Sequence, residues 1–121
     1  MKYMLLIYNR EGCMTDAERA ACMAESLRVC DELKGRGPFL DASPLHPVAT
    51  AATVRVRGGQ VLVTDGPFAE THEQLGGFFL IEADSIEEAT KIAAQIPAGR
   101  WGTVEVRPVL QVEGLPQAAS A

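Results

Sequence analysis

The sequence has no long apolar run and no cluster of basic residues. No stretch approaches the roughly 18 apolar residues of a membrane-spanning helix. The start, MKYMLLIYNR, is no convincing signal peptide, because its apolar run is only about six residues long and no small-residue cleavage site follows. The net charge is −5, which disfavours binding driven by nucleic-acid phosphates. We therefore expect a cytoplasmic protein that binds neither a membrane nor nucleic acid.

Cysteine is scarce, and its spacing favours neither a disulfide nor a metal site. The three cysteines are Cys13, Cys22 and Cys30, and no CxxC motif is present. On one helix, Cys22 and Cys30 would lie about 12 Å apart along the axis, too far for a bridge. No His or second Cys pair has zinc-ligand spacing. We expect free thiols that act as small buried apolar residues, as suits a reducing cytosol.

The common catalytic and nucleotide-binding motifs are also missing. The sequence contains no GxSxG, no P-loop, no Rossmann fingerprint and no HExxH. We therefore predict no cofactor and no metal, and Ser-His-Asp chemistry has no support. What is present is a chain of 121 residues, 47% hydrophobic and 22% charged, which is enough for one globular domain with its own core.

Hydrophobic periodicity predicts the main elements. Residues 2–8 and 77–83 are apolar on both alternating faces, which indicates two central strands. Two capping boxes, Thr15 with Glu18 and Ser85 with Glu88, open helices that we expect to end near Lys34 and at Ile96-Pro97. Shorter extended segments are expected at 39–42 and 102–109. One face of the first helix carries a set of apolar residues: Ala20, Met23, Leu27, Cys30 and Leu33.

A hairpin is predicted between ATVRV and VLVTD, with Gly58-Gly59 as its two-residue turn. The register follows from this turn. It pairs Arg57 with Gln60, Val56 with Val61, Val54 with Val63 and Ala52 with Asp65. The alternation of side chains then places Asp65 at the end of an apolar face formed by the four valines.

The order β-α-β-β-β-α-β matches an α+β, ferredoxin-like split βαβ sheet with an extra hairpin and with helices on one face. Because both faces of the central strands are apolar, the face without helices should also be covered. A second copy of the chain is the simplest cover, so we expect a homodimer that packs sheet against sheet. Such packing would leave a cavity between the sheets for a small ligand.

Several segments resemble the DGPF subgroup of the YCII-related family: VTDGPFAETHEQLGGFFLIEADSIEEA, GTVEVRPV, MKYMLLIY, LHPVATAATVRVRGGQ and IPAGRWG. The resemblance covers residues 1–110 as one domain and leaves 111–121 as a predicted disordered tail. It implies a dimeric α+β barrel, similar to small enzymes that isomerise or dehalogenate lactone-type and aromatic-derived compounds. Members of the subgroup are often encoded near extracytoplasmic-function sigma factors, which implies a regulatory partner as an alternative.

The resemblance also shows where this chain departs from its relatives. In the wider family, a His on the first helix paired with an Asp is the proposed acid/base couple. The first helix here, DAERAACMAESLRVCDELK, has no His, and Glu25 or Ser26 falls near that place. The subgroup commonly has Lys at the position of His72.

Two interpretations of the DGPF loop stay open. Asp65 could cap the loop by accepting N–H bonds from residues 67–68, or it could act as an acid/base at the mouth of the cavity. Phe68 could plug the core or form a wall on which a ligand stacks. Glu70 and His72, with Glu73, could be a solvated loop face or contribute to ligand binding.

Two further candidates lie outside this loop. His46 stands between Leu45 and Pro47 in a rigid loop; it could be an ordinary surface or core residue, or it could transfer protons, to which histidine is suited near neutral pH. Arg100 could clamp an anionic group of a substrate or form a surface ion pair. The prediction is a lyase or isomerase of small carbonyl or lactone compounds, with Asp65 as general base or anchor, His46 as proton partner and Arg100 as anion clamp. The alternative is a non-catalytic ligand-binding or accessory protein.

Overall fold

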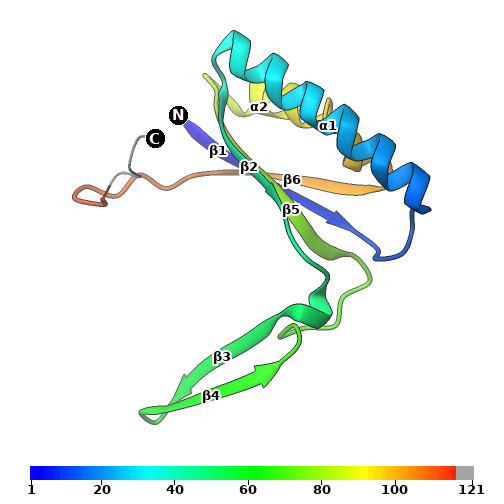
Figure 1. Cartoon of the computed structure of the whole chain (residues 1–121). Coiled ribbons are helices and arrows are strands. Elements are labelled where there is room, and N and C mark those ends of the chain that lie inside the picture. Colours follow the sequence, from blue (N-terminus) through cyan, green and yellow to red (C-terminus); the bar gives the residue numbers. More distant parts are fainter. Residues whose placement is uncertain (117–121) are drawn as a thin grey trace.

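A computed structural model describes residues 1–116 and shows a mixed α+β fold (Figure 1). The strands are β1 (Lys2–Asn9), β2 (Phe39–Pro44), β3 (Ala52–Arg57), β4 (Gln60–Asp65), β5 (Gln74–Glu82) and β6 (Gly102–Pro108). The α-helices are α1 (Asp16–Arg36) and α2 (Ile86–Ala93), and short 3-10 turns span Val48–Thr50 and Pro97–Arg100. The observed order has four strands between the two helices, one more than the predicted order β-α-β-β-β-α-β, because the short extended segment expected at 39–42 forms strand β2. No helix within residues 1–116 is both long and apolar enough to cross a membrane.

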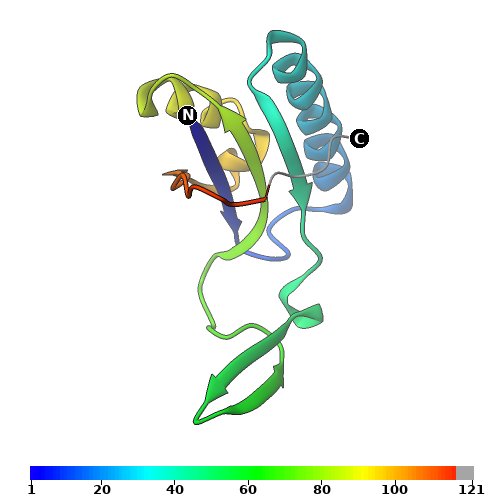
Figure 2. The same cartoon turned by 90° about the vertical axis from the view of Figure 1, so that its left-hand side faces the viewer.

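Four antiparallel strands form the main sheet in the order β2-β5-β1-β6. The two strands predicted to be central, β1 and β5, are the inner pair, and both helices lie on one face of the sheet (Figures 1 and 2). The helices cover one of the two apolar faces of these strands, and the apolar residues of the other face lie on the side of the sheet without helices.

The core lies between the sheet and the helices. Alternate residues of β1 and β5 are buried on this side, and Leu33 of α1 and Ile92 of α2 pack against them. The buried side chains of the two strands are Tyr3, Leu5, Ile7, Phe79 and Ile81. The opposite face carries Met4, Leu6, Tyr8, Phe78 and Leu80, all of which are only half-buried. Its coverage by a second copy stays a prediction.

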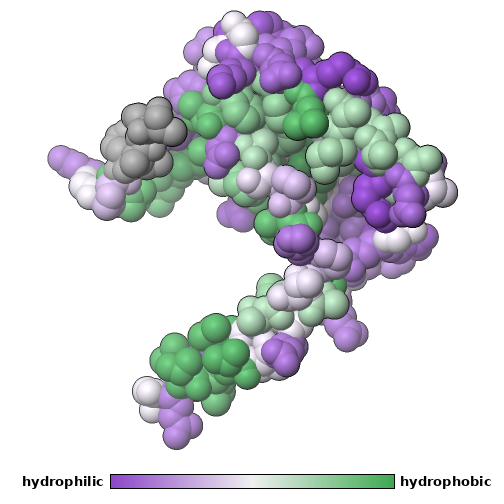
Figure 3. All heavy atoms as spheres, in the orientation of Figure 1, coloured by the Kyte–Doolittle hydropathy of each residue, from purple (hydrophilic) through white to green (hydrophobic). Residues whose placement is uncertain are grey.

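The hairpin β3–β4 projects away from the sheet (Figures 1 and 2). Every predicted residue pair is confirmed, from Arg57 with Gln60 to Ala52 with Asp65. The turn works because Gly58 and Gly59 have φ angles of 54° and 80°, a region that side chains disfavour. The valines of one face are exposed and form a hydrophobic patch on the hairpin (Figure 3).

Two predicted helix ends and one predicted capping box need correction. Helix α1 continues to Arg36, because Gly35 is accommodated in the helix and Gly37, with φ of 106°, forms the C-cap. Helix α2 ends at Ala93, before Ile96-Pro97. The Ser85 hydroxyl accepts from the Glu88 N–H at 3.2 Å, but the Glu88 carboxylate accepts from Asp84 N, so the second capping box is incomplete.

Two other predictions meet the structure only in part. Of the predicted apolar face of α1, only Leu33 is buried, because the N-terminal half of the helix stands away from the sheet. Residues 111–116 of the predicted tail contain neither helix nor strand, and 117–121 lie outside the described residues.

Candidate functional site

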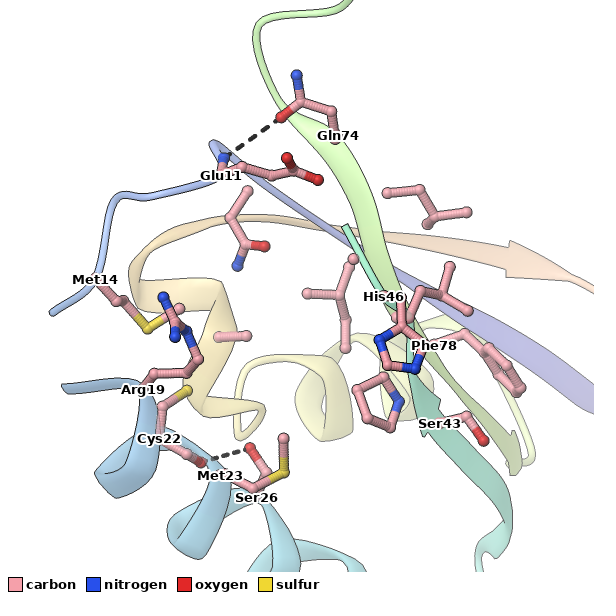
Figure 4. A pocket seen from close by; sticks show the side chains of 18 of the residues that line it. Glu11, Met14, Arg19, Cys22, Met23, Ser26, Ser43, His46, Gln74 and Phe78 are labelled. Carbon is pink, nitrogen blue, oxygen red and sulfur yellow. Dashed lines mark hydrogen bonds between the residues drawn. The ribbon is translucent and has the colours of Figure 1, made fainter. Parts of the chain in front are cut away.

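A cavity of about 670 Å³ lies between the N-terminal half of α1 and one end of the sheet (Figure 4). Four segments line it, with Ala98: the end of β1 and the loop to Met14, one face of α1, residues 42–47, and residues 74–79. The cavity exists because α1 packs on the core through Leu33, Val29 and Cys30, near its C-terminal end. Towards its N-terminus, Met23 and Leu27 line open space and are exposed.

One wall of the pocket is a single stripe of α1. Its residues are spaced three and four apart, which places them on the same helix face: Arg19, Cys22, Met23, Ser26, Leu27 and Cys30. The Ser26 hydroxyl donates to the carbonyl of Cys22 at 2.8 Å, and Arg19 forms an exposed ion pair with Asp16 at 3.3 Å. Ser26, one of the two residues expected near the family's helix histidine, therefore lies at the pocket.

His46 lies on the opposite wall, near Phe78 (Figure 4). The loop that carries it is held on both sides. The Leu45 N–H donates to the carbonyl of Gly76 at 2.8 Å, and the Val48 N–H donates to the Glu11 carboxylate at 2.7 Å. These bonds, together with Pro44 and Pro47, fix the backbone around an exposed imidazole that faces the cavity.

Sequence reasoning missed most of the polar residues around the pocket. Glu11 anchors the His46 loop, and its own N–H donates to the Gln74 side chain at 3.4 Å. Arg19 and Ser26 interrupt the apolar face of α1. The sequence pattern could have indicated these two residues, because polar residues that recur on the apolar face of a helix indicate that this part of the face is not packed in the core.

Arg100 does not line this pocket. Its guanidinium pairs with the Glu25 carboxylate on α1, so the surface ion-pair alternative describes what is observed. The pKa of Arg100 is raised, first by this hydrogen bond and by the charge of Glu25, and to a smaller extent by Cys22. Arg100 is therefore held against α1 by Glu25, outside the pocket lining.

The DGPF loop lies at the base of the hairpin, away from the pocket. The loop closes through its backbone, because Gly66 N donates to the Ala51 carbonyl at 2.7 Å and the Thr53 hydroxyl donates to the Gly66 carbonyl at 2.8 Å. Within residues 1–116, the Asp65 carboxylate has no hydrogen-bond partner and is exposed. The other candidates of this loop, Phe68, Glu70 and His72, are exposed as well, and Phe68 reaches 78%.

A smaller polar group lies on the open face of the sheet. The Tyr8 hydroxyl donates to Glu105 at 3.3 Å, and the Thr103 hydroxyl donates to Glu73 at 2.9 Å. Burial and the neighbouring Glu105 carboxylate raise the pKa of Tyr8. Among residues 1–116, no group of three or more His, Cys, Asp and Glu side chains is placed to hold a metal ion.

Comparison with known proteins agrees with this architecture. A family model described as the YCII-related domain matches residues 1–113. An uncharacterized protein of Rhizobium meliloti (strain 1021) is 38% identical over 118 residues, which cover 90% of this chain and 92% of the relative.

The fold also resembles a solved structure: 5-chloro-2-hydroxyhydroquinone dehydrochlorinase from Burkholderia phenoliruptrix AC1100 in complex with 2,5-dihydroxybenzoquinone. The TM-score is 0.56 at 18% identity, over 93% of this chain and 97% of the other. At this identity the likeness concerns the fold alone. The family match, which spans nearly the whole length, shows that the chain belongs to the YCII-related family.

Proposed function

We propose that the cavity beneath α1 binds a small organic molecule and that the protein is a lyase- or isomerase-type enzyme. The observation that carries this proposal is the cavity itself, whose volume of about 670 Å³ falls in the usual range for ligand pockets. Its lining is mainly apolar, with a few polar groups on facing walls. Such a site binds a ring or short chain by burial and orients it through a few hydrogen bonds.

His46 is the proposed acid/base group, because it is the only pocket residue of residues 1–116 whose side chain ordinarily exchanges protons near neutral pH. Arg10 and Arg19 line the same cavity and supply positive charge for a carboxylate or phenolate. Together they suit a small carbonyl or hydroxylated ring compound. The dehydrochlorinase that shares the fold, seen with a quinone, makes quinone-like rings the first class to test.

Asp65 enters this proposal only through a second subunit. It sits at the end of β4, outside the pocket lining. A role as acid/base beside His46 therefore requires the hairpin of another copy to reach the cavity. Phe68, Glu70 and His72 can likewise bind the ligand only if the hairpin of a second copy reaches the cavity. Arg100 can act as an anion clamp only after its ion pair with Glu25 breaks.

A non-catalytic ligand-binding protein, with or without a link to a sigma factor, is the second candidate. The observation that favours it is the absence of a histidine from the pocket face of α1, where Ser26 stands instead. Binding without turnover would then be the function of the same cavity.

Ligand binding and turnover separate these candidates. Hydroxybenzoates, hydroquinones, quinones and lactones should be screened for an increase in Tm and then for conversion. We expect at least one compound to raise the Tm of the wild type but not that of Arg19→Ala. Arg28→Ala should keep the increase, because Arg28 is an exposed residue of α1 outside the pocket lining. For an enzyme, His46→Gln should still bind but should turn over at least about 100-fold more slowly.

Each result can contradict the proposal. A ligand that stabilises the Arg19→Ala variant as well as the wild type binds elsewhere. Undiminished turnover by His46→Gln rules out His46 as the acid/base. Binding without any conversion across the whole set supports the non-catalytic candidate.

A further inference from the structure

The segment after β6 carries apolar side chains that are largely exposed. Leu110, Val112 and Leu115 are 82%, 54% and 65% exposed. The Val109 N–H donates to the Lys2 carbonyl at 2.9 Å, and the chain then runs on past the start of β1 (Figure 1). Beyond that bond, the segment up to residue 116 makes one backbone hydrogen bond, from Leu115 N–H to the Val112 carbonyl within its own turn. An apolar segment of this kind is typical of a contact with another molecule.

The hairpin β3–β4 has an edge without a partner. In a hairpin with a two-residue turn, the pair next to the turn, Arg57 with Gln60, is hydrogen-bonded, and bonded and non-bonded pairs then alternate. The backbone groups of Val54 and Val56 therefore point to the outer edge of β3. The Val56 carbonyl accepts from the Arg57 side chain at 3.0 Å, which agrees with this orientation. No strand among residues 1–116 pairs with this edge, and such an edge is a template for another strand.

The segment and the ribbon match in their side-chain patterns. In an extended strand, Leu110 and Val112 point to one side and Glu113 points to the other. The ribbon carries its four valines, which are 58–65% exposed, on one face. The other face carries Arg55 and Arg57, neither of which forms an ion pair in the described part of the chain. A strand beside β3 with its apolar side chains on the valine face thus brings its carboxylate to the arginine face.

The segment and the hairpin are attached at opposite ends of the sheet. β6 ends at Pro108, and its neighbour in β1 is Tyr3, near the start of that strand. The hairpin joins β5 at Gln74, which pairs with Asn9 at the end of β1. The eight residues of β1, about 25 Å, separate these two ends. Two copies that pack sheet against sheet about a twofold axis, with strands running in opposite directions, bring the segment of each copy to the hairpin of the other.

We propose that residues 110–113 of one copy form a third strand on the outer edge of β3 in a second copy, and that the exchange is mutual. The added strand bonds to the outward backbone groups of β3, covers the valine face with Leu110 and Val112, and sets Glu113 beside the arginines. It gives the projecting ribbon the further strand that a two-stranded hairpin needs for stability. The proposal does not depend on the ligand cavity.

A photo-crosslinker tests this contact in the full-length protein. p-Benzoylphenylalanine replaces Leu110, and the irradiated protein is separated by denaturing electrophoresis and mapped by mass spectrometry. We expect a covalent dimer in which the probe is attached to residues 52–57 of the second chain. The same probe at Arg28, an exposed position of α1, is the control and should give no such product.

Truncation provides a second measurement. A chain that ends at Val109 should dimerise at least about tenfold more weakly in sedimentation equilibrium. At a concentration at which it is dimeric, the outward amides of β3 should exchange with solvent at least about tenfold faster than in the full chain, because they have lost the added strand. The matched control ends at Pro116, keeps the segment and should behave as the full chain does. The outward amides of β4 should exchange at the same rate in all three proteins.

Four results would overturn the proposal. A covalent monomer with the probe attached to 52–57 shows that the segment folds onto its own hairpin. No crosslink, or attachment outside 52–57, places the segment elsewhere. Undiminished dimerisation and unchanged amide exchange in the chain that ends at Val109 remove the segment from the interface. Faster exchange at the outward amides of β4 in place of those of β3 assigns the added strand to the wrong edge.

Discussion

The position with the least room for a side chain lies where β1 meets β6. Gly102 pairs with Asn9, and a Cβ atom at residue 102 would overlap the carbonyl oxygen of Tyr8 and come within 3.0 Å of the Asn9 Cα atom. Both obstacles are backbone atoms of a central strand, so neither can move without disturbing the sheet. The glycine is therefore required by close packing of the backbone.

We predict that Gly102→Ala lowers the free energy of unfolding by about 2–3 kcal/mol, as overpacking does elsewhere. Gly35→Ala is the matched control, because Gly35 lies in α1 and a Cβ there meets nothing within 4 Å. It should raise the stability by up to about 1 kcal/mol. Urea denaturation measures both values, and a Gly102→Ala variant as stable as wild type would show that β6 can shift away from β1.

Helix α1 has two functions along its length. Leu33, near its C-terminal end, is fully buried, while Leu27, less than two turns earlier, is 59% exposed and lines the cavity. The first residue holds the helix on the core, and the second borders the site. One helix therefore contributes both an anchor and a wall.

We expect Leu33→Ala to lower the free energy of unfolding by about 2–5 kcal/mol, because it leaves a void in the core. Leu27→Ala removes the same atoms from a surface already open to solvent and should cost less than about 1 kcal/mol. Urea unfolding monitored by circular dichroism gives both. If Leu27→Ala lowered the free energy of unfolding as much as Leu33→Ala, the prediction would be wrong, because Leu27 would then pack against other atoms beneath α1.

Sequence reasoning succeeded where the physical cause is local. Alternation within 2–8 and 77–83 identifies the central strands, and Gly58-Gly59 determines the hairpin register, because only that turn brings Val56 opposite Val61. The pocket could not be predicted in this way. The apolar stripe of α1 shows which side faces inward, but the distance between a helix and a sheet depends on residues far apart in the sequence.

The site predictions met the same limit. His46 lines the cavity, and hydrogen bonds of Leu45 to Gly76 and of Val48 to Glu11 hold the backbone of its loop in place. The DGPF motif invited attention to Asp65, Phe68, Glu70 and His72, yet the hairpin carries them away from the pocket. Their roles depend on an assembly that one chain does not contain.

At the scale of the whole molecule, two apolar surfaces lack a partner within residues 1–116. One is the open face of the sheet, with Met4, Leu6, Phe78 and Leu80, and the other is the valine face of the projecting hairpin (Figures 1 and 3). A two-stranded ribbon is at best marginally stable by itself. A second copy related by a twofold axis would cover the sheet face and support the hairpin of each chain.

We therefore predict a homodimer that depends on the hairpin. The double substitution Val56→Asp with Val61→Asp places two charges on one cross-strand pair and should yield a monomer in sedimentation equilibrium. Circular dichroism should stay unchanged, because neither side chain contributes to the core. Gln60→Asp, at the turn, is the control and should remain dimeric. A wild-type protein that sediments as a monomer would contradict the prediction.

The strand order also affects how the chain acquires its structure during synthesis. Of the six described strands, β1 is translated first, yet it pairs only with β5 and β6, which are translated last. Until β5 is complete at Glu82, about two-thirds of the way along the 121 residues, the apolar residues of β1 have no partner strand, whereas the β3–β4 ribbon can form from neighbouring residues alone. The nascent chain thus carries an unpaired apolar segment for most of its elongation, and that interval is when chaperone contact would matter most.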